Sequence, residues 1–254
     1  MTELAGLERG VAKQLETFRK KIGQEAEDVI FVVFPKKPSE LEGLIHESTF
    51  ESSPFHLSHA AASTDVTVYP PPELSNGDNG DDLRDPKKRK LEDSTSMDVQ
   101  FANGPEVRPQ RVVANKHIQV VQEIIKNQCD EMIVFLDKVK LWINMQMPNG
   151  DNFGVQIQED VLGELHRSSS SVIAMRDWAR GSNIGRAKLC SKLIKYPNIE
   201  DYTLALKEHD ERELFSAKQH LYEIRSVYAV IMDLIHKNIA KLRAPKGNNS
   251  ISLY

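Results

Sequence analysis

The spacing of apolar residues constrains this chain most, because they recur every three or four positions over four long stretches. Such spacing places them on one face of an α-helix, so each stretch predicts a long amphipathic helix. The most regular stretch contains Leu214, Ala217, Leu221, Ile224, Tyr228, Ile231, Ile235, Asn238 and Leu242. Another contains Ile118, Val121, Ile125, Gln128, Met132, Phe135, Val139 and Trp142.

The first stretch runs from Leu4 to Val33. We expect Pro35 and Pro38 to stop this helix, because proline has no amide hydrogen for the helical hydrogen bond. A short helical continuation through Leu41, Leu44 and Ile45 is compatible with the pattern.

The remaining stretch runs from Val155 to Ile194, and Pro197 separates it from the last helix. Glu200 and Asp201 suit the first turn of that last helix, where the helix dipole favours negative charge. The sequence therefore predicts an all-α fold, a bundle of four long antiparallel helices.

The composition changes between Ser48 and Gln110, where Pro, Ser, Asn, Gly and Asp dominate and apolar residues are scattered. Such a segment predicts a disordered or loosely folded linker between the first two helices. The expected organisation is an N-terminal helix (1–47), the linker (48–110), helices two to four (111–247) and a C-terminal tail (248–254).

The linker contains a compact basic cluster after Pro86, made of Lys87, Lys88, Arg89 and Lys90. We interpret it as a nuclear-import signal that binds the acidic groove of an import receptor. The alternative is an ordinary solvated run of charge. Nucleic-acid binding is disfavoured, because no aromatic residues alternate with the cations and the net charge of the chain is −4.

The sharpest break between two helices is the stretch from Pro148 to Gly154. Proline interrupts the helical hydrogen bonds, Asn-Gly tolerates positive φ, and Asp or Asn can cap the next helix, so a tight loop is predicted. Its aromatic residue either packs back into the bundle or contacts a partner. The candidate loop residues are Asn149, Gly150, Asp151, Asn152, Phe153 and Gly154.

Pro245 and Gly247 are expected to end the last helix. The chain then finishes with Ile251, Ser252, Leu253 and Tyr254. Such an end is either frayed or inserted into a pocket that recognises a C-terminal carboxylate.

Cys129 and Cys190 lie in predicted helices without metal-binding or redox spacing, which indicates reduced thiols in an intracellular protein. No stretch has the length and apolarity of a membrane span, and Met1–Gly10 is too polar for a signal peptide. We therefore expect a cytosolic or nuclear protein that has no membrane contact.

No set of residues predicts catalysis or a cofactor, and no metal site is expected. His56 and His59 have no third ligand, and the serines at 168–171 have no recognisable His and Asp partners. The segment Gly181–Lys188 lacks the end of a nucleotide-binding loop and is expected to mark a weak or bent point in a helix. The carboxylates are interpreted as solvated surface groups. These features favour a binding or assembly protein over an enzyme.

Four sequence blocks in order resemble the REG (11S-type) activators of the proteasome core particle, in particular their nuclear gamma type. The blocks are Glu25-Ala26-Glu27-Asp28 with Phe34-Pro35-Lys36-Lys37; Asn152-Phe153-Gly154-Val155 with Ile157-Gln158-Glu159; Arg186-Ala187-Lys188-Leu189 with Lys195-Tyr196-Pro197 and Glu200-Asp201-Tyr202; and Leu253-Tyr254.

The resemblance implies a four-helix subunit of a homoheptameric ring around a channel. The tails Ile251–Tyr254 would bind pockets of the core particle's α-subunit ring, and the loop Asn149–Gly154 would open its gate. Peptides and unfolded proteins would then enter without ATP or ubiquitin. Wide apolar faces would be buried between ring neighbours.

The sequence departs from the family pattern in two ways: Asp151 replaces an asparagine, and the loop before Phe153 is shorter than usual. Both predict weaker gate opening without loss of ring assembly. Two alternatives remain, a nuclear coiled-coil scaffold without a proteasome role and a hydrolase that uses a serine or His166 and His209.

Overall fold

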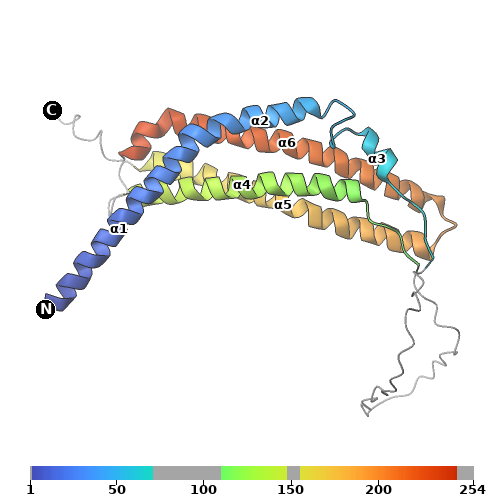
Figure 1. Cartoon of the computed structure of the whole chain (residues 1–254), viewed down its shortest axis with the longest axis horizontal. Helices are drawn as coiled ribbons and strands as arrows, with labels where there is room; N and C mark the ends of the chain where they lie inside the picture. Colours follow the sequence, from blue (N-terminus) through green and yellow to red (C-terminus); the bar gives the residue numbers. More distant parts are fainter. Residues whose placement is uncertain (1, 71–109, 148–154, 245–254) are drawn as a thin grey trace, which may run out of the picture.

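The protein is a bundle of four long helical segments, as the apolar spacing predicts (Figure 1). The computed structural model describes residues 2–70, 110–147 and 155–244, with side chains from Gly10 onward. The helices are α1 (Thr2–Asp28), the π-helix η1 (Val29–Val33), α2 (Phe34–Glu47), α3 (Ser58–Ser63), α4 (Lys116–Gln146), α5 (Gln156–Lys195) and α6 (Glu200–Arg243). No helix within these ranges carries an apolar run of membrane-spanning length.

The core lies where α6 packs against α2, α4 and α5, and α4 packs against α5. The predicted seam of α6 is buried from Leu214 to Leu242 except at Asn238, which is half-buried. On α4 the seam shifts by one position, because Cys129 and Leu136 are buried where Gln128 and Phe135 were expected. A helix of 3.6 residues per turn drifts against a strict heptad pattern, which explains this shift.

The expectation that Pro35 and Pro38 stop the first helix is wrong. The chain continues without a break through η1 into α2, with Pro35 in its first turn and Pro38 inside it. The wider π turn, in which the amide of Phe34 donates to the carbonyl of Val29, changes the hydrogen-bond register just before the first proline. Such π turns accommodate local disruption inside longer helices.

The expectation of a disordered or loosely folded segment is wrong for residues 48–70, which are packed against the bundle. Phe55 and Ala60 are 2% and 3% exposed, and α3 packs on α4 and α6. The backbones of Tyr69 and Arg111 exchange hydrogen bonds of 2.8 and 3.1 Å in an isolated bridge. A few well-placed apolar anchors thus order a segment whose composition resembles a loop.

The segment Gly181–Lys188 does not interrupt α5, which is one continuous helix. Gly185 leaves room for the imidazole of His209, since a Cβ at this position would lie 3.3 Å from its Cε1. The glycine therefore admits a side chain of α6 and does not bend the helix.

Candidate docking end of the bundle

The end of α4, the start of α5 and the end of α6 lie together at one end of the molecule (Figure 1). We call this the docking end, because the two segments predicted to contact a partner extend from it. The loop 149–154 falls between α4 and α5, and the tail 251–254 follows α6. Both segments, and the basic cluster 87–90, lie outside the described residues.

Buried apolar residues hold the chain where it leaves the bundle at this end. Ile143 near the end of α4 is 0% exposed, Val155 at the start of α5 is 1% exposed, and Leu242 near the end of α6 is 0% exposed. The amide of Glu159 donates to the carbonyl of Val155 at 3.0 Å and so closes the first turn of α5. Burial therefore holds these three helix ends in place.

A hydrogen bond joins the start of α5 to the end of α6. Nε2 of Gln158 donates to the carbonyl oxygen of Lys241 at 2.6 Å, and Gln158 is 1% exposed. The last carbonyls of a helix have no partner within it, so a buried side-chain donor satisfies one of them. This contact links the first turn of α5, which follows the predicted loop, to the last turn of α6, which precedes the predicted tail.

The end of α6 is also held by α1 and η1. Arg243 forms an ion pair with Glu27 at 2.8 Å, and its guanidinium lies 5.2 Å from the centre of the Phe31 ring. The Phe31 ring meets His236 edge to face at 5.3 Å. These contacts are partly exposed to solvent, so each adds little to stability, yet together they hold the end of α6 against α1 and η1.

The opposite end of the bundle contains a buried polar cluster around Asp210, which is 0% exposed. Its carboxylate accepts hydrogen bonds from Nε of Arg186 at 2.9 Å, Nδ2 of Asn115 at 2.9 Å and Oγ1 of Thr64 at 3.0 Å. Asn115 also caps α4 by accepting from the amide of Ile118 at 3.1 Å. The cluster therefore joins α4, α5, α6 and the end of α3.

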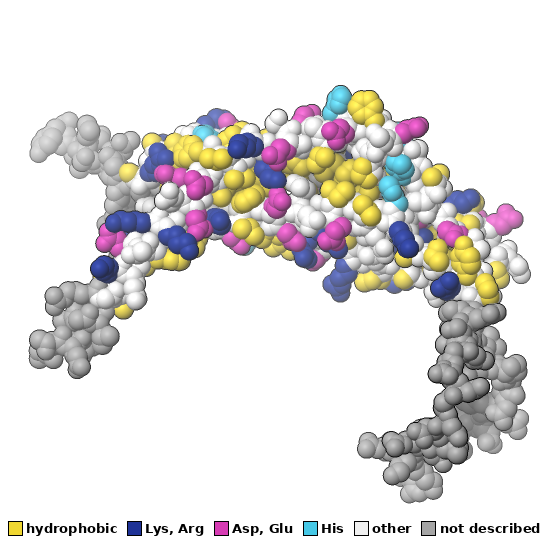
Figure 2. Space-filling model, in the orientation of Figure 1, with side chains coloured by type: hydrophobic (Ala, Val, Ile, Leu, Met, Phe, Trp, Pro, Cys, Tyr) yellow, Lys and Arg dark blue, Asp and Glu magenta, His cyan; other side chains and the backbone are white. Residues whose placement is uncertain are grey.

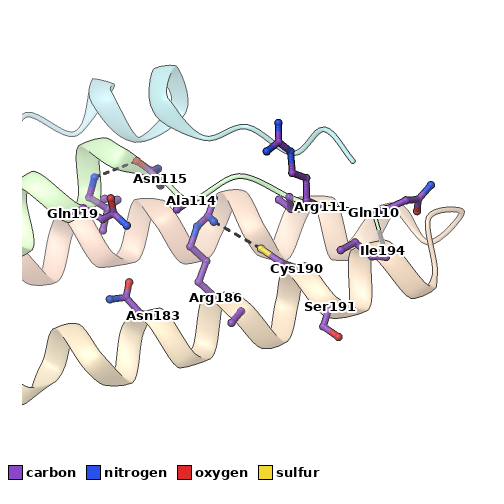
Figure 3. A pocket seen from close by; sticks show the side chains of 13 residues that line it. Gln110, Arg111, Ala114, Asn115, Gln119, Asn183, Arg186, Cys190, Ser191 and Ile194 are labelled. Atoms are coloured by element: carbon purple, nitrogen blue, oxygen red, sulfur yellow. Dashed lines mark hydrogen bonds between the residues drawn. The ribbon is translucent and has the colours of Figure 1, made fainter. Parts of the chain in front are cut away.

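A cavity of about 570 Å³ lies beside this cluster, and Arg186 and Cys190 form part of its wall (Figure 3). The guanidinium of Arg186 already has hydrogen-bond partners within the protein, because Nη1 donates to the carbonyl of Val113 at 2.9 Å in addition to the bonds with Asp210. Burial raises the pKa of the Cys190 thiol and keeps it protonated. Arg186 therefore joins α5 to α6 and to the segment before α4.

Sequence reasoning missed this cluster. Asp210 was grouped with the solvated carboxylates, an interpretation that is wrong for Asp210 and for Glu213, which is 6% exposed. Arg186 was considered within the segment Gly181–Lys188 and a resembling block, and not as the partner of a buried carboxylate. An aspartate inside the apolar face of a helix was the available signal, since buried carboxylates need a partner.

The other candidate residues lie apart from the docking end. His59 stacks on His117 with ring centres 4.6 Å apart, and His56 hydrogen-bonds Ser58 at 2.7 Å. No group of three metal-ligating side chains occurs in the part of the chain that the structure describes. In the serine stretch, Ser168 and Ser169 are 7% and 6% exposed, and Oγ of the exposed Ser170 donates to the backbone carbonyl of His166 at 3.1 Å.

Comparison with known proteins identifies the family. Residues 10–69 match the family described as Proteasome activator PA28, N-terminal, and residues 111–252 match Proteasome activator PA28, C-terminal. The two matched segments leave the basic cluster between them.

The chain is 34% identical to Proteasome activator complex subunit 3 of Gallus gallus over the whole of both chains. It is 32% identical to the Homo sapiens protein with the same description, again over the whole of both. A crystal structure titled as the 11S subunit of the Plasmodium falciparum proteasome, PA28, has the same fold, with a TM-score of 0.67, 24% identity and coverage of 94% of this chain and 95% of that one. The resemblance seen in the four sequence blocks is thus confirmed, and this chain belongs to the PA28 (REG, 11S-type) family of proteasome activators.

Proposed function

We propose that this chain is a proteasome activator subunit that assembles into a homoheptameric ring, binds the α-subunit ring of the core particle through its C-terminal tails and opens the gate with the loop 149–154. It acts without ATP or ubiquitin and is a regulator, not an enzyme. Peptides and unfolded proteins are the substrates that pass through the ring.

The contact between Gln158 and Lys241 carries this proposal. A tail that docks and a loop that opens a gate must be held at a fixed separation, because a partner surface contacts both together. The hydrogen bond of 2.6 Å between the start of α5 and the end of α6 supports such a coupling, because the loop precedes α5 and the tail follows α6. Family membership supplies the partner, the proteasome core particle.

Exposed apolar residues on several sides of the described bundle support ring assembly. On α4 these are Val134 and Leu141, 52% and 39% exposed, and on α6 they are Leu204 and Phe215, 59% and 50% exposed. Figure 2 shows apolar side chains spread among charged ones over one face of the bundle. A closed ring of identical copies needs two different complementary faces on each subunit, which such residues can supply.

The basic cluster Lys87–Lys90 leads us to propose nuclear import through an import receptor, with the cytoplasm as a second location. Asp151 and the short loop lead us to propose that gate opening is weaker than in relatives with an asparagine at this position. Both proposals concern residues outside the described ranges and rest on the sequence.

The test is hydrolysis of a fluorogenic peptide by purified core particle, with and without this chain. A truncated chain that lacks Leu253 and Tyr254 is compared in parallel. We expect the full chain to stimulate hydrolysis and the truncated chain to lose that stimulation while it still forms a ring. The chain alone should not hydrolyse the peptide.

If intact rings of the full chain give no stimulation, the gate-opening role is wrong. If no ring forms and the truncation changes nothing, the chain acts as a nuclear coiled-coil scaffold. Turnover by the chain without core particle would instead support the hydrolase alternative.

A further inference from the structure

The N-terminal half of α1 extends away from the bundle (Figure 1). Every residue from Gly10 to Lys21 is exposed, and Ile22 is the first buried residue of the helix. We call residues 10–21 the arm. Its apolar side chains are open to solvent, with Val11 62% exposed and Leu15 and Phe18 each 46% exposed.

The arm is strongly amphipathic. Val11, Leu15 and Phe18 follow at spacings of four and three, so they form one stripe along the helix. Arg19 and Lys21 lie on either side of this stripe by helical geometry. A helix of this length without tertiary contacts is only marginally stable in water, so a partner surface is needed to bury the stripe.

The arm is also basic. Positions 10–21 contain four cations and one carboxylate, Glu16. Figure 2 shows basic side chains along the part of α1 that leaves the bundle. A complementary surface would combine acidic and apolar groups.

The first three turns of α5 provide such a surface. They contain Glu159, Asp160 and Glu164, and the first cation of the helix is Arg167. Glu159 and Asp160 are exposed, and Ile157, three residues before Asp160 and on the same side of the helix, is half-buried. The arm of the same copy does not cover this surface, because α1 packs on α4 and the arm residues are exposed.

We propose that the arm packs on the first turns of α5 of a second copy of this chain, with its apolar stripe against Ile157 and its cations near Glu159 and Asp160. The arm and the start of α5 lie at the same end of the bundle (Figure 1). Copies related by a rotation axis along the bundle stand level with one another, so features at the same end meet across the interface. The inference rests on the proposed ring and adds the contact that closes it.

The first experiment removes the stripe. Both variants are made in the full-length chain. The stripe variant carries Leu15→Ala and Phe18→Ala together, and the control variant carries Lys13→Ala and Lys20→Ala together, on the opposite face of the arm. All four changes give the best helix former, so the helix propensity of the arm is kept in both variants. Sedimentation velocity over a concentration series measures assembly.

We expect the stripe variant to raise the concentration needed for assembly by about tenfold or more, and the control variant to change it less than about twofold. Equal assembly of the two variants would overturn the proposal. A stripe variant whose separated subunits also unfold more easily than those of the control would overturn it as well, since the stripe would then pack on its own bundle.

The second experiment identifies the partner surface by charge reversal. Arg19→Glu with Lys21→Glu, and Glu159→Lys with Asp160→Lys, should each weaken assembly, because like charges then face one another. The chain with all four changes should regain most of the assembly that either pair loses, although the lysines remain unfavourable at the start of α5. If the chain with all four changes regains no assembly, the start of α5 is not the surface that binds the arm.

The result is separable from that for the proposed function. If the unaltered chain forms no ring, the proposed function fails. If it forms a ring that the stripe and charge variants leave unchanged, only the role of the arm is wrong.

Discussion

At the scale of single residues, Asp210 has the most demanding environment in the described part of the molecule. Its side chain is 0% exposed and that of its partner Arg186 is 11% exposed. A buried ion pair adds little net stability, because both charges lose their water. It does specify which helices meet, since Asp210 accepts all three hydrogen bonds only when Arg186, Asn115 and Thr64 are in place.

Asp210→Asn is expected to lower the free energy of unfolding by about 3–5 kcal/mol, because it leaves the guanidinium of Arg186 buried without a counter-charge. Guanidinium chloride unfolding at a fixed subunit concentration measures the change, since assembly also contributes to stability. Glu211→Gln, one residue along on the exposed surface, is the control. If Asp210→Asn lowers the free energy of unfolding no more than Glu211→Gln does, the ion pair of Asp210 and Arg186 is solvated.

Cys129 makes stability depend on pH above the neutral range. Burial raises the pKa of its thiol from 9.0 to about 12, with a further increase from the charge of Asp130. The folded state therefore retains a proton that the unfolded state has lost. This contribution is complete below pH 9 and is lost as pH rises toward 12.

Cys129→Ala should remove this part of the pH dependence, which is about 1.4 kcal/mol per pH unit between the two pKa values. Urea unfolding of both proteins at a neutral pH and at several pH values above 9 tests this. Burial also raises the pKa of the neighbouring Tyr228, and this effect of burial cancels because Tyr228 stays in both proteins. The smaller increase that the charge of Cys129 causes in the Tyr228 pKa is lost together with Cys129. Parallel stability curves for the two proteins would contradict the assignment.

At the scale of elements, the sequence predicts the long helices well, because apolar spacing reports directly which face of a helix is buried. Pro35 misled the prediction, since a proline in sequence does not reveal that a π turn precedes it. Residues 48–70 misled it for another reason. Their composition is that of a loop, and the burial of Phe55 depends on helices far away in the sequence.

The contacts within the candidate site could be predicted only in part. In an antiparallel four-helix bundle, the end of the second helix, the start of the third and the end of the fourth must lie at one end. Topology alone therefore predicts that the loop and the tail leave the bundle at the same end. The hydrogen bond from Gln158 to Lys241 depends on side-chain geometry, which apolar spacing does not encode.

At the scale of the whole molecule, the two ends of the bundle serve different purposes. One end is closed by the polar cluster of Asp210, and the other presents the start of α5, the end of α6 and the arm of α1. In the proposed ring, every copy contributes one tail at that second end. Binding to the core particle then depends on several weak contacts acting together, and the ring sets their effective concentration.

Rings assembled from mixtures of full-length chain and chain without Leu253 and Tyr254 test this dependence. Because each missing tail removes one factor from a multivalent interaction, stimulation should fall more steeply than the fraction of intact tails. At a ring concentration near half-saturation, an equal mixture should give clearly less than half the stimulation of intact rings. Fluorogenic-peptide hydrolysis by core particle measures it.

The control mixture replaces the truncated chain with full-length chain carrying Glu211→Gln, which keeps every tail and alters only an exposed side chain. This mixture should stimulate as well as intact rings do. A linear fall with the truncated chain would mean that each tail acts alone. In that case the ring would supply a channel but would not increase the affinity for the core particle. The contact between Gln158 and Lys241 would then act only within each subunit.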